Sequence, residues 1–214
     1  MMVSAENDPR RSGTIWMHNL DEPAPVITPL VDATFRRAGP ESILALAEAM
    51  GSEAQGEILE RFETGRRCYA AWVDGQLVTY GWVSFEEELI GELGLRVRLL
   101  PGEAYIWDCA TVPAFRRFRL YSALLGYILE VLRSGGWCRV WIGADLENVA
   151  SHRGIDRAGF RRVADLLVAR QSAQRLAWIQ GYPGVPENLV AQVRRAFLDD
   201  REKVWLDASS QAPR

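Results

Sequence analysis

The stretch that most constrains the fold lies near the middle of the chain, where a strand, a helix and a second strand are predicted in succession. Residues 103–112 are mostly apolar, as in a central strand, and Pro113 ends the run. From Leu120 to Leu132 apolar residues recur at helical spacing, and residues 137–144 form the next apolar run. A strand, a crossover helix and a strand make a right-handed unit. We therefore predict an α/β (α+β) fold in which these strands are parallel or splayed neighbours.

A second strong signal is the Asp74-Gly75 pair, which separates two β-rich runs, residues 67–73 and 76–85. A two-residue Asp-Gly loop is typical of a type I′ turn, so we predict an antiparallel hairpin. Three glutamates, residues 86–88, follow the hairpin. They are either a solvated loop or an acidic lip that attracts a cationic amine.

Shorter signals surround these two units. A proline-rich segment, residues 21–31, is expected to be extended, and residues 91–100 are either a short strand or a loop. The other predicted elements are a strand at 13–20, helices at 43–50 and 52–61 (with Ser52 as N-cap), a helix at 149–158 capped by Asn148, strands at 163–170 and 175–179, and a helix at 188–198. We expect a disordered start over residues 1–12, one domain over 13–180, and a C-terminal helix and tail, 181–214, packed on that domain.

Composition and charge exclude several classes of protein. The net charge of −3 argues against a dedicated nucleic-acid binder, which is usually basic. The chain has three cysteines in apolar runs, two histidines and no CxxC, so a metal site is not expected. The apolar runs are too short for a membrane span, and the polar start has no signal-peptide core. We expect a soluble, cytoplasmic protein.

Three features follow one another along the chain and together resemble the GNAT acyltransferase family. The Asp74-Gly75 hairpin comes first. The strand that ends at Val112 then leads into residues 116–121, in a pattern similar to the family's acyl-CoA motif, [QR]-x-x-G-x-[GA]. Last comes Asn148, with Ser151 three residues later and Gly159-Phe160 eleven and twelve later, similar to the family's N-x-x-A…GF segment.

The resemblance implies a mixed, mainly antiparallel twisted sheet of about six to seven strands with a central βαβ unit and flanking helices. It implies acetyl-CoA or another acyl-CoA as co-substrate, without a metal, and a small-molecule or peptide amine as acceptor, and it is compatible with a homodimer. Helix N-terminal N–H groups would bind the donor's pyrophosphate, and the splayed strand would pair with its pantetheine arm. The implied donor-binding residues are Ala110, Thr111, Val112, Arg116, Arg117, Phe118, Arg119, Leu120, Tyr121, Ser122, Asn148 and Ser151.

The chain departs from the family pattern at two places. The glycine positions of the acyl-CoA motif are occupied by Arg119 and Tyr121. Arginine side chains can bind phosphate by charge-assisted hydrogen bonds, but the change also fits a domain that has lost its donor. Many family members have a tyrosine acid seven residues after the asparagine, where this chain has Ile155. The acid would then be another group, such as Tyr121, or water.

Two carboxylates on the predicted central strand, Glu103 and Asp108, are candidate general bases because carboxylates on apolar strands are unusual. Asp108 would point to the face opposite that of Glu103 and Tyr105 unless a bulge intervenes. Cys109 has no predicted histidine partner, so a covalent acyl-enzyme is not favoured. The sequence therefore favours an N-acyltransferase that acts by direct attack in a ternary complex. The alternatives are a catalytically degenerate GNAT-fold binding or scaffolding module and an acyltransferase that uses a longer acyl donor.

Overall fold

The structure, a computed structural model, describes residues 10–90, 95–171 and 174–197 of the 214. Its strands are β1 (Arg10–Asn19), β2 (Thr34–Ala38), β3 (Arg67–Val73), β4 (Gln76–Ser84), β5 (Glu87–Ile90), β6 (Leu95–Arg98), β7 (Glu103–Thr111), β8 (Arg139–Asp145), β9 (Arg161–Gln171) and β10 (Gln174–Gly181). Its helices are α1 (Ile43–Met50), α2 (Gln55–Glu63), α3 (Leu120–Ser134), α4 (Val149–Arg157) and α5 (Glu187–Phe197).

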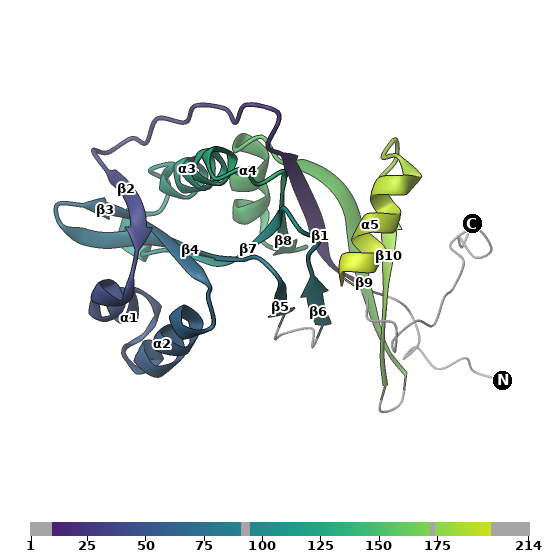
Figure 1. Cartoon of the computed structure of the whole chain (residues 1–214), viewed down its shortest axis with the longest axis horizontal. Helices are drawn as coiled ribbons and strands as arrows, with labels where there is room; N and C mark the ends of the chain where they lie inside the picture. The colour runs from purple at the N-terminus through teal and green to yellow at the C-terminus, as the bar shows by residue number, and fades with distance from the viewer. Residues whose placement is uncertain (1–9, 91–94, 172–173, 198–214) are drawn as a thin grey trace.

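Eight of the described strands form one sheet in the spatial order β10-β9-β1-β8-β7-β4-β3-β2. Only β7 and β8 pair in parallel within it, and the other neighbours are antiparallel. The predicted mixed, mainly antiparallel fold is confirmed. The helices α3 and α4 cover one face, and α1 and α2 lie on the other side of the sheet, with β5 and β6 between α2 and α5 (Figure 1).

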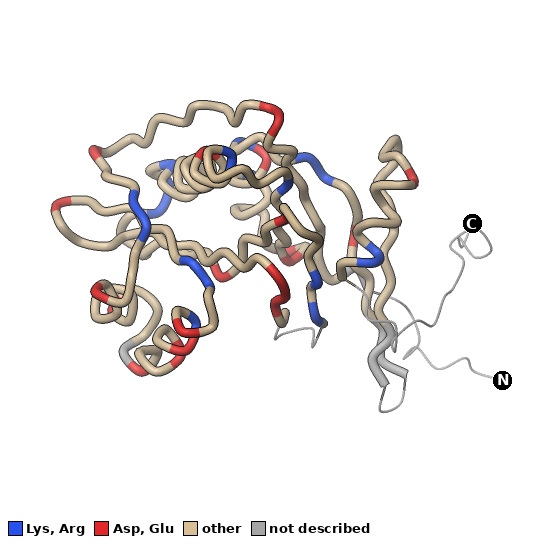
Figure 2. Tube along the Cα trace, in the orientation of Figure 1, with Lys and Arg blue, Asp and Glu red and all other residues tan. Residues whose placement is uncertain are grey.

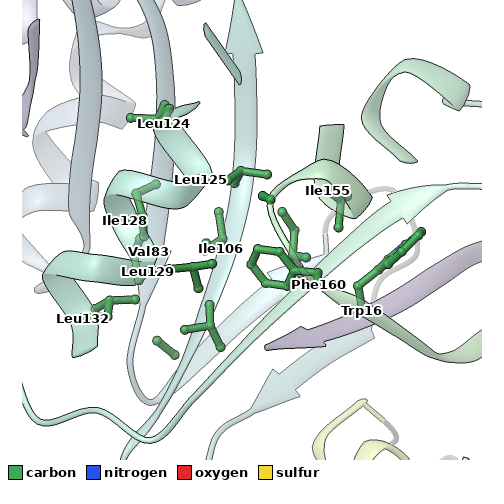
Figure 3. Packing of buried hydrophobic residues seen from close by; sticks show 14 of the residues in the cluster. Trp16, Val83, Ile106, Leu124, Leu125, Ile128, Leu129, Leu132, Ile155 and Phe160 are labelled. Carbon is green, nitrogen blue, oxygen red and sulfur yellow. The ribbon is translucent and has the colours of Figure 1, made fainter. Parts of the chain in front are cut away.

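The main core lies between α3 and the centre of the sheet. The apolar residues at helical spacing in α3 face inward, so that Leu125, Ile128 and Leu132 are each at most 1% exposed. They pack against strand residues such as Ile106 and against Phe160, as Figure 3 shows. A second cluster, on the opposite face, joins β1, β8, β9 and α5.

The hairpin predicted at Asp74-Gly75 is confirmed. Both residues have positive φ angles, 49° and 80°, as a type I′ turn requires, and β3 pairs with β4. The parallel arrangement of β7 and β8 is also confirmed, but only over their first halves. Their pairing runs from Glu103 opposite Arg139 to Ile106 opposite Ile142 and then stops. The second halves of these strands are splayed.

One local prediction was wrong, and one strand was not predicted. The helix α2 begins at Gln55 with Ala54 at its N-cap, so Ser52 is not the cap of this helix. The strand β2 was not predicted, because its five residues, two of them arginines, carry no apolar alternation. Such short, charged strands are common at sheet edges, and β2 is the edge of this sheet.

The three glutamates after the hairpin do not form a simple solvated loop. Glu87 and Glu88 begin β5, which pairs with β6, and Figure 2 shows the acidic start of β5 beside the basic β6. Glu88 is 4% exposed and accepts hydrogen bonds from Ser84 and Arg66. Glu87 pairs with Arg96 across the hairpin at 2.6 Å. The charge of these two residues is therefore matched within the protein.

Other predictions fall at the edges of the described residues. The predicted disordered start, residues 1–12, lies outside them up to residue 9, and β1 begins at Arg10. The tail after Phe197 and part of the stretch 91–100 also lie outside them. No described helix is long and apolar enough to cross a bilayer. No group of three metal-ligating side chains gathers among the described residues.

Candidate active site

A cleft of about 230 Å³ lies where β7 and β8 part. Its walls come from the second halves of these strands, from the first turn of α3 at Tyr121, and from α4 with its cap, Asn148. Since β7 and β8 do not pair beyond Ile106 and Ile142, the backbone edges that face each other across the cleft carry no ladder bonds to one another. Such an edge can accept an extended, amide-bearing ligand in place of a strand.

A β-bulge in β7 shapes this cleft. Tyr80 pairs with Ala110 and Trp82 with Trp107, so Asp108 and Cys109 both lie opposite the single residue Gly81. Asp108 takes a left-handed φ of 41°, which is uncommon for a residue other than glycine. The bulge also depends on Gly81, because a Cβ there would lie 2.8 Å from the Cys109 sulfur.

The sequence pattern places Asp108 on the face opposite that of Glu103 and Tyr105 unless a bulge intervenes. The bulge is present, and Asp108 lines the cleft. Its carboxylate accepts a hydrogen bond of 2.5 Å from Arg61, a residue of α2 that is 9% exposed. Arg61 also bonds Glu57 and lies 4.4 Å from the ring centre of Trp107. The guanidinium therefore holds the carboxylate in place, while the side chain of Asp108 stays about one-third exposed (32%).

Tyr121 lines the cleft beside α4. Its hydroxyl is 3.1 Å from the hydroxyl of Ser151 in the first turn of α4. Burial raises the pKa of Tyr121, and the neighbouring Cys109 raises it further, so the phenol is protonated at neutral pH. The ring rests on Gly154, where a Cβ would lie only 2.4 Å from a ring carbon. Gly154 thus makes room for this tyrosine between α3 and α4.

The loop before α3 has left-handed backbone conformations that glycine usually provides, although the loop contains no glycine. Arg117 and Arg119 both have left-handed φ angles, 70° and 61°. The N–H groups of residues 117–122 donate no backbone hydrogen bond to the described residues. Neighbouring N–H groups in such a conformation form a concave site for anions, next to the positive end of a helix dipole. All three arginines of the loop, which include Arg116, are exposed.

The proline-rich segment holds this loop from outside. Leu30 donates its N–H to the carbonyl of Phe118, between the two left-handed arginines, at 3.0 Å. The rings of Phe115 and Phe118 pack with Val31 in a small apolar cluster on the sheet. A strained loop conformation persists only when its surroundings enforce it. The segment predicted to be extended therefore supports the loop as well as linking β1 to β2.

Of the predicted donor-binding residues, Tyr121, Asn148 and Ser151 line the cleft, and the others lie at the end of β7, in the arginine loop or in the first turn of α3. Ala110 and Thr111 end β7, and Val112 leads out of it. Leu120 and Ser122 are 1% and 3% exposed, so their side chains belong to the core and only their backbones face the loop. The predicted N-cap is confirmed: Asn148 accepts a hydrogen bond from the Ser151 N–H at 3.0 Å.

Glu103 is placed elsewhere. It begins β7, five residues before Asp108 and roughly 16 Å from it along the strand. Its carboxylate is buried, with Arg139 at 3.2 Å and the N–H of Leu100 at 3.1 Å, and it does not line the cleft. Glu103 therefore forms a structural ion pair with Arg139, whereas Asp108 is the strand carboxylate that reaches the cleft.

Cys109 lines the cleft but is not built as a nucleophile. Burial raises the pKa of its thiol far above the usual range, and the carboxylate of Asp108 adds to the effect. The described histidine nearest in sequence to the cleft residues, His152, is buried in contact with Trp16 and bonds the carbonyl of Asp145. His152 is not the surface residue that its polar helix suggests, and it has a structural place in the core.

Two residues that shape the site carried no usable signal in the sequence. Arg61 lies 47 positions before its partner Asp108, on a helix whose polar face looks like an ordinary solvated surface. Gly154 lies inside a predicted helix, where glycine is merely unfavourable. Its presence there against propensity is a hint that another group approaches closely, but only the fold shows that the group is Tyr121.

No curated protein matches this chain. Among solved structures, a GNAT acetyltransferase from Colwellia psychrerythraea is similar with a TM-score of 0.53 and 15% identity, over 83% of this chain and 58% of that one. A GNAT-family structure from Novosphingobium aromaticivorans has a TM-score of 0.50 and 18% identity, over 80% and 71% of the two chains. These likenesses concern the fold.

A match at the level of the sequence family is more specific. The model of the acetyltransferase (GNAT) family matches residues 32–160. This segment begins just before β2 and ends at Phe160, so it contains both splayed strands, the arginine loop, α3 and α4. The first strand, β1, lies outside it, although β1 sits between β8 and β9 in the sheet. Since the match covers more than half of its length, the chain belongs to the acetyltransferase (GNAT) family.

Proposed function

We propose that this protein is an N-acyltransferase that moves an acetyl group from acetyl-CoA to an amine, by direct attack within a ternary complex. Enzymes of the family use acetyl-CoA or another acyl-CoA. The observation that carries the proposal is the cleft between β7 and β8, which is lined by Tyr121 at the start of α3 and by Asp108, with the arginine loop directly before α3.

The donor would lie along this cleft with its pyrophosphate at residues 116–121. The free N–H groups of the loop and the dipole of α3 supply the binding that glycine loops supply elsewhere, because Arg117 and Arg119 already have left-handed backbones. Their exposed side chains, with Arg116, add positive charge. The pantetheine amides would pair with the unpaired edge of β7 between Ile106 and Thr111.

The chemistry then needs three groups. The neutral amine attacks the thioester carbonyl carbon, and backbone N–H groups of the splayed strands would stabilise the oxyanion. Asp108 accepts the proton that the amine nitrogen loses. Tyr121, kept protonated by burial, gives its proton to the sulfur as the carbon–sulfur bond breaks, and Ser151 beside it can pass a proton back from solvent.

Calorimetry with acetyl-CoA tests the first half of the proposal and separates an enzyme from a degenerate binding or scaffolding module. Binding in the micromolar range is expected, and it should weaken when Arg116 and Arg119 are both changed to Ala. The matched control is Arg133→Ala, which removes an exposed arginine from the far end of the same helix, where it pairs with Glu130. Absence of donor binding at millimolar concentration would overturn the enzyme proposal.

Thiol release in the presence of amines tests the second half. Asp108→Asn and Tyr121→Phe should each lower kcat by about 10- to 100-fold while leaving the affinity for acetyl-CoA within about twofold. If both variants keep full activity with a donor that still binds, proton transfer does not pass through these residues. Comparing the rates of thiol release with acetyl-CoA and with longer acyl-CoA donors identifies the preferred length of the acyl chain.

A further inference from the structure

The cleft continues past the reacting centre to an end away from α3 and α4. At that end it is bounded by Ile90 of β5, Trp107 of β7, Leu166 of β9 and Phe197 of α5. These side chains belong to the second core cluster or pack against it, and that cluster lies on the sheet face opposite α3, so the cleft reaches through the splay to that face. If the donor occupies the side of α3, an acceptor must approach the thioester from this second side.

All four of these side chains are apolar. Leu166 and Phe197 are 3% and 1% exposed and form a fixed floor within the second core cluster. Ile90 and Trp107 are half-buried and pack against the edge of the same cluster. A polar group that entered this space would lose its hydration without gaining partners from these walls, which is costly. The walls therefore fit a hydrocarbon body.

The charges of the cleft have one sign. Among the described residues that line it, the charged side chains are Asp108 and Asp145, and no lysine or arginine lines it. Arg61 is not among the lining residues, but it pairs with Asp108 and also contacts Trp107 and Glu57, so it neutralises part of the charge of Asp108. The ammonium group of an acceptor is attracted to such a cleft, whereas a carboxylate on an acceptor meets only like charge there.

We infer that the acceptor is a monoamine on an apolar body, an arylalkylamine or alkylamine without an acidic group. The inference rests on the proposed function and names the substrate class of the same site. The ammonium is attracted to Asp108, its neutral amine form attacks the thioester, and the hydrocarbon body contacts Ile90 and Trp107. Amino acids bring a carboxylate to an acidic cleft, amino sugars bring unpartnered hydroxyls, and polyamines bring a second charge against apolar walls.

The test compares four amines with acetyl-CoA as donor: 2-phenylethylamine, L-phenylalanine, glucosamine and spermidine. The first two differ only by a carboxylate, so they isolate the effect of that charge. We expect kcat/KM for 2-phenylethylamine to exceed that for phenylalanine by about tenfold or more, and to exceed those for the other two amines. Ile90→Arg should reduce the ratio of kcat/KM for 2-phenylethylamine to kcat/KM for phenylalanine, because the arginine gives the carboxylate a partner. Ile90→Leu, the matched control, should leave this ratio unchanged.

The outcomes separate this inference from the proposal on which it rests. If acetyl-CoA binds but phenylalanine, glucosamine or spermidine is the best acceptor, the substrate class is wrong and the acyltransferase proposal stands. If acetyl-CoA binds and 2-phenylethylamine does not accelerate thiol release, the inference is also overturned. If acetyl-CoA does not bind at all, both fail. Thermal melting of the two Ile90 variants shows whether each is folded before rates are compared.

Discussion

Replacing Arg119 by glycine and, in parallel, by alanine separates the two parts that this residue plays in the loop. Arg119 has a φ of 61°, and a left-handed backbone costs a residue with a Cβ about 1–2 kcal/mol relative to glycine. Alanine keeps this cost and loses the charge, whereas glycine loses both. The extra freedom of glycine in the unfolded chain offsets about 0.4–1 kcal/mol of its gain.

Arg119→Gly should therefore raise the free energy of unfolding by about 0.5–1 kcal/mol relative to Arg119→Ala. For a chain of this size the difference corresponds to about 1–4 °C in Tm, which a calorimetric melt can resolve. Both variants lose one cation from the proposed pyrophosphate site. Both should bind acetyl-CoA about three- to tenfold more weakly than the unchanged protein, with a smaller difference at high salt.

Two results would refute this reasoning. Equal Tm values for the glycine and alanine variants would mean that the left-handed conformation at Arg119 is not strained. Recovery of full donor affinity in Arg119→Gly, with a loss in Arg119→Ala, would mean that close backbone approach decides binding and that the guanidinium makes no contact with phosphate. Leu30→Pro is an independent test of how the loop conformation is held, because it removes the N–H group that donates to the carbonyl of Phe118. Leu30→Ala keeps that N–H and should be neutral, since the side chain is 59% exposed.

Four further predictions concern the rest of the site. Gly154→Ala places a Cβ 2.4 Å from the ring of Tyr121, so it should lower the free energy of unfolding by about 1–3 kcal/mol and reduce kcat, and an unchanged melt would contradict this packing. Tyr121→Phe should lose the same factor in kcat at pH 7 and pH 9, because burial raises the pKa of Tyr121 and keeps it protonated throughout; a factor that shrinks toward pH 9 would show that the hydroxyl titrates there. Glu103→Gln should destabilise by about 1–3 kcal/mol, since it weakens the buried pair with Arg139, and leave kcat unchanged in thiol-release assays. Cys109→Ala should retain activity, and mass spectrometry of the unchanged protein should detect no acyl-enzyme. An acyl adduct on Cys109 of the unchanged protein would exclude direct attack.

Parts of the fold and the site could be predicted because their signals are local. The Asp74-Gly75 turn needs two positive φ angles, which those residue types favour, so the hairpin follows from the sequence. The period of α3 and its glycine stop define the crossover between two apolar strands. Asn148 caps α4 through a bond to an N–H three residues away. Each of these depends on residues that are neighbours in the chain.

Other features could not be predicted, because they depend on contacts between distant residues. Whether Glu103 or Asp108 reaches the cleft depends on a bulge opposite Gly81, and no local pattern marks that bulge. The pairing of Arg61 with Asp108 joins two elements that meet only in the folded sheet. The placement of β1 between β8 and β9 is likewise a choice among strand pairings that the sequence leaves open.

The arginine loop shows where the division lies. The sequence by itself determined that residues 116–121 join a central strand to an amphipathic helix, and that arginines stand where the family has small residues. Only the tertiary structure decided that Arg117 and Arg119 nevertheless take left-handed backbones, with Leu30 bonded to Phe118 between them. The reason is physical: local preference disfavours this conformation, and contacts made by a segment more than eighty residues earlier in the chain hold it in place.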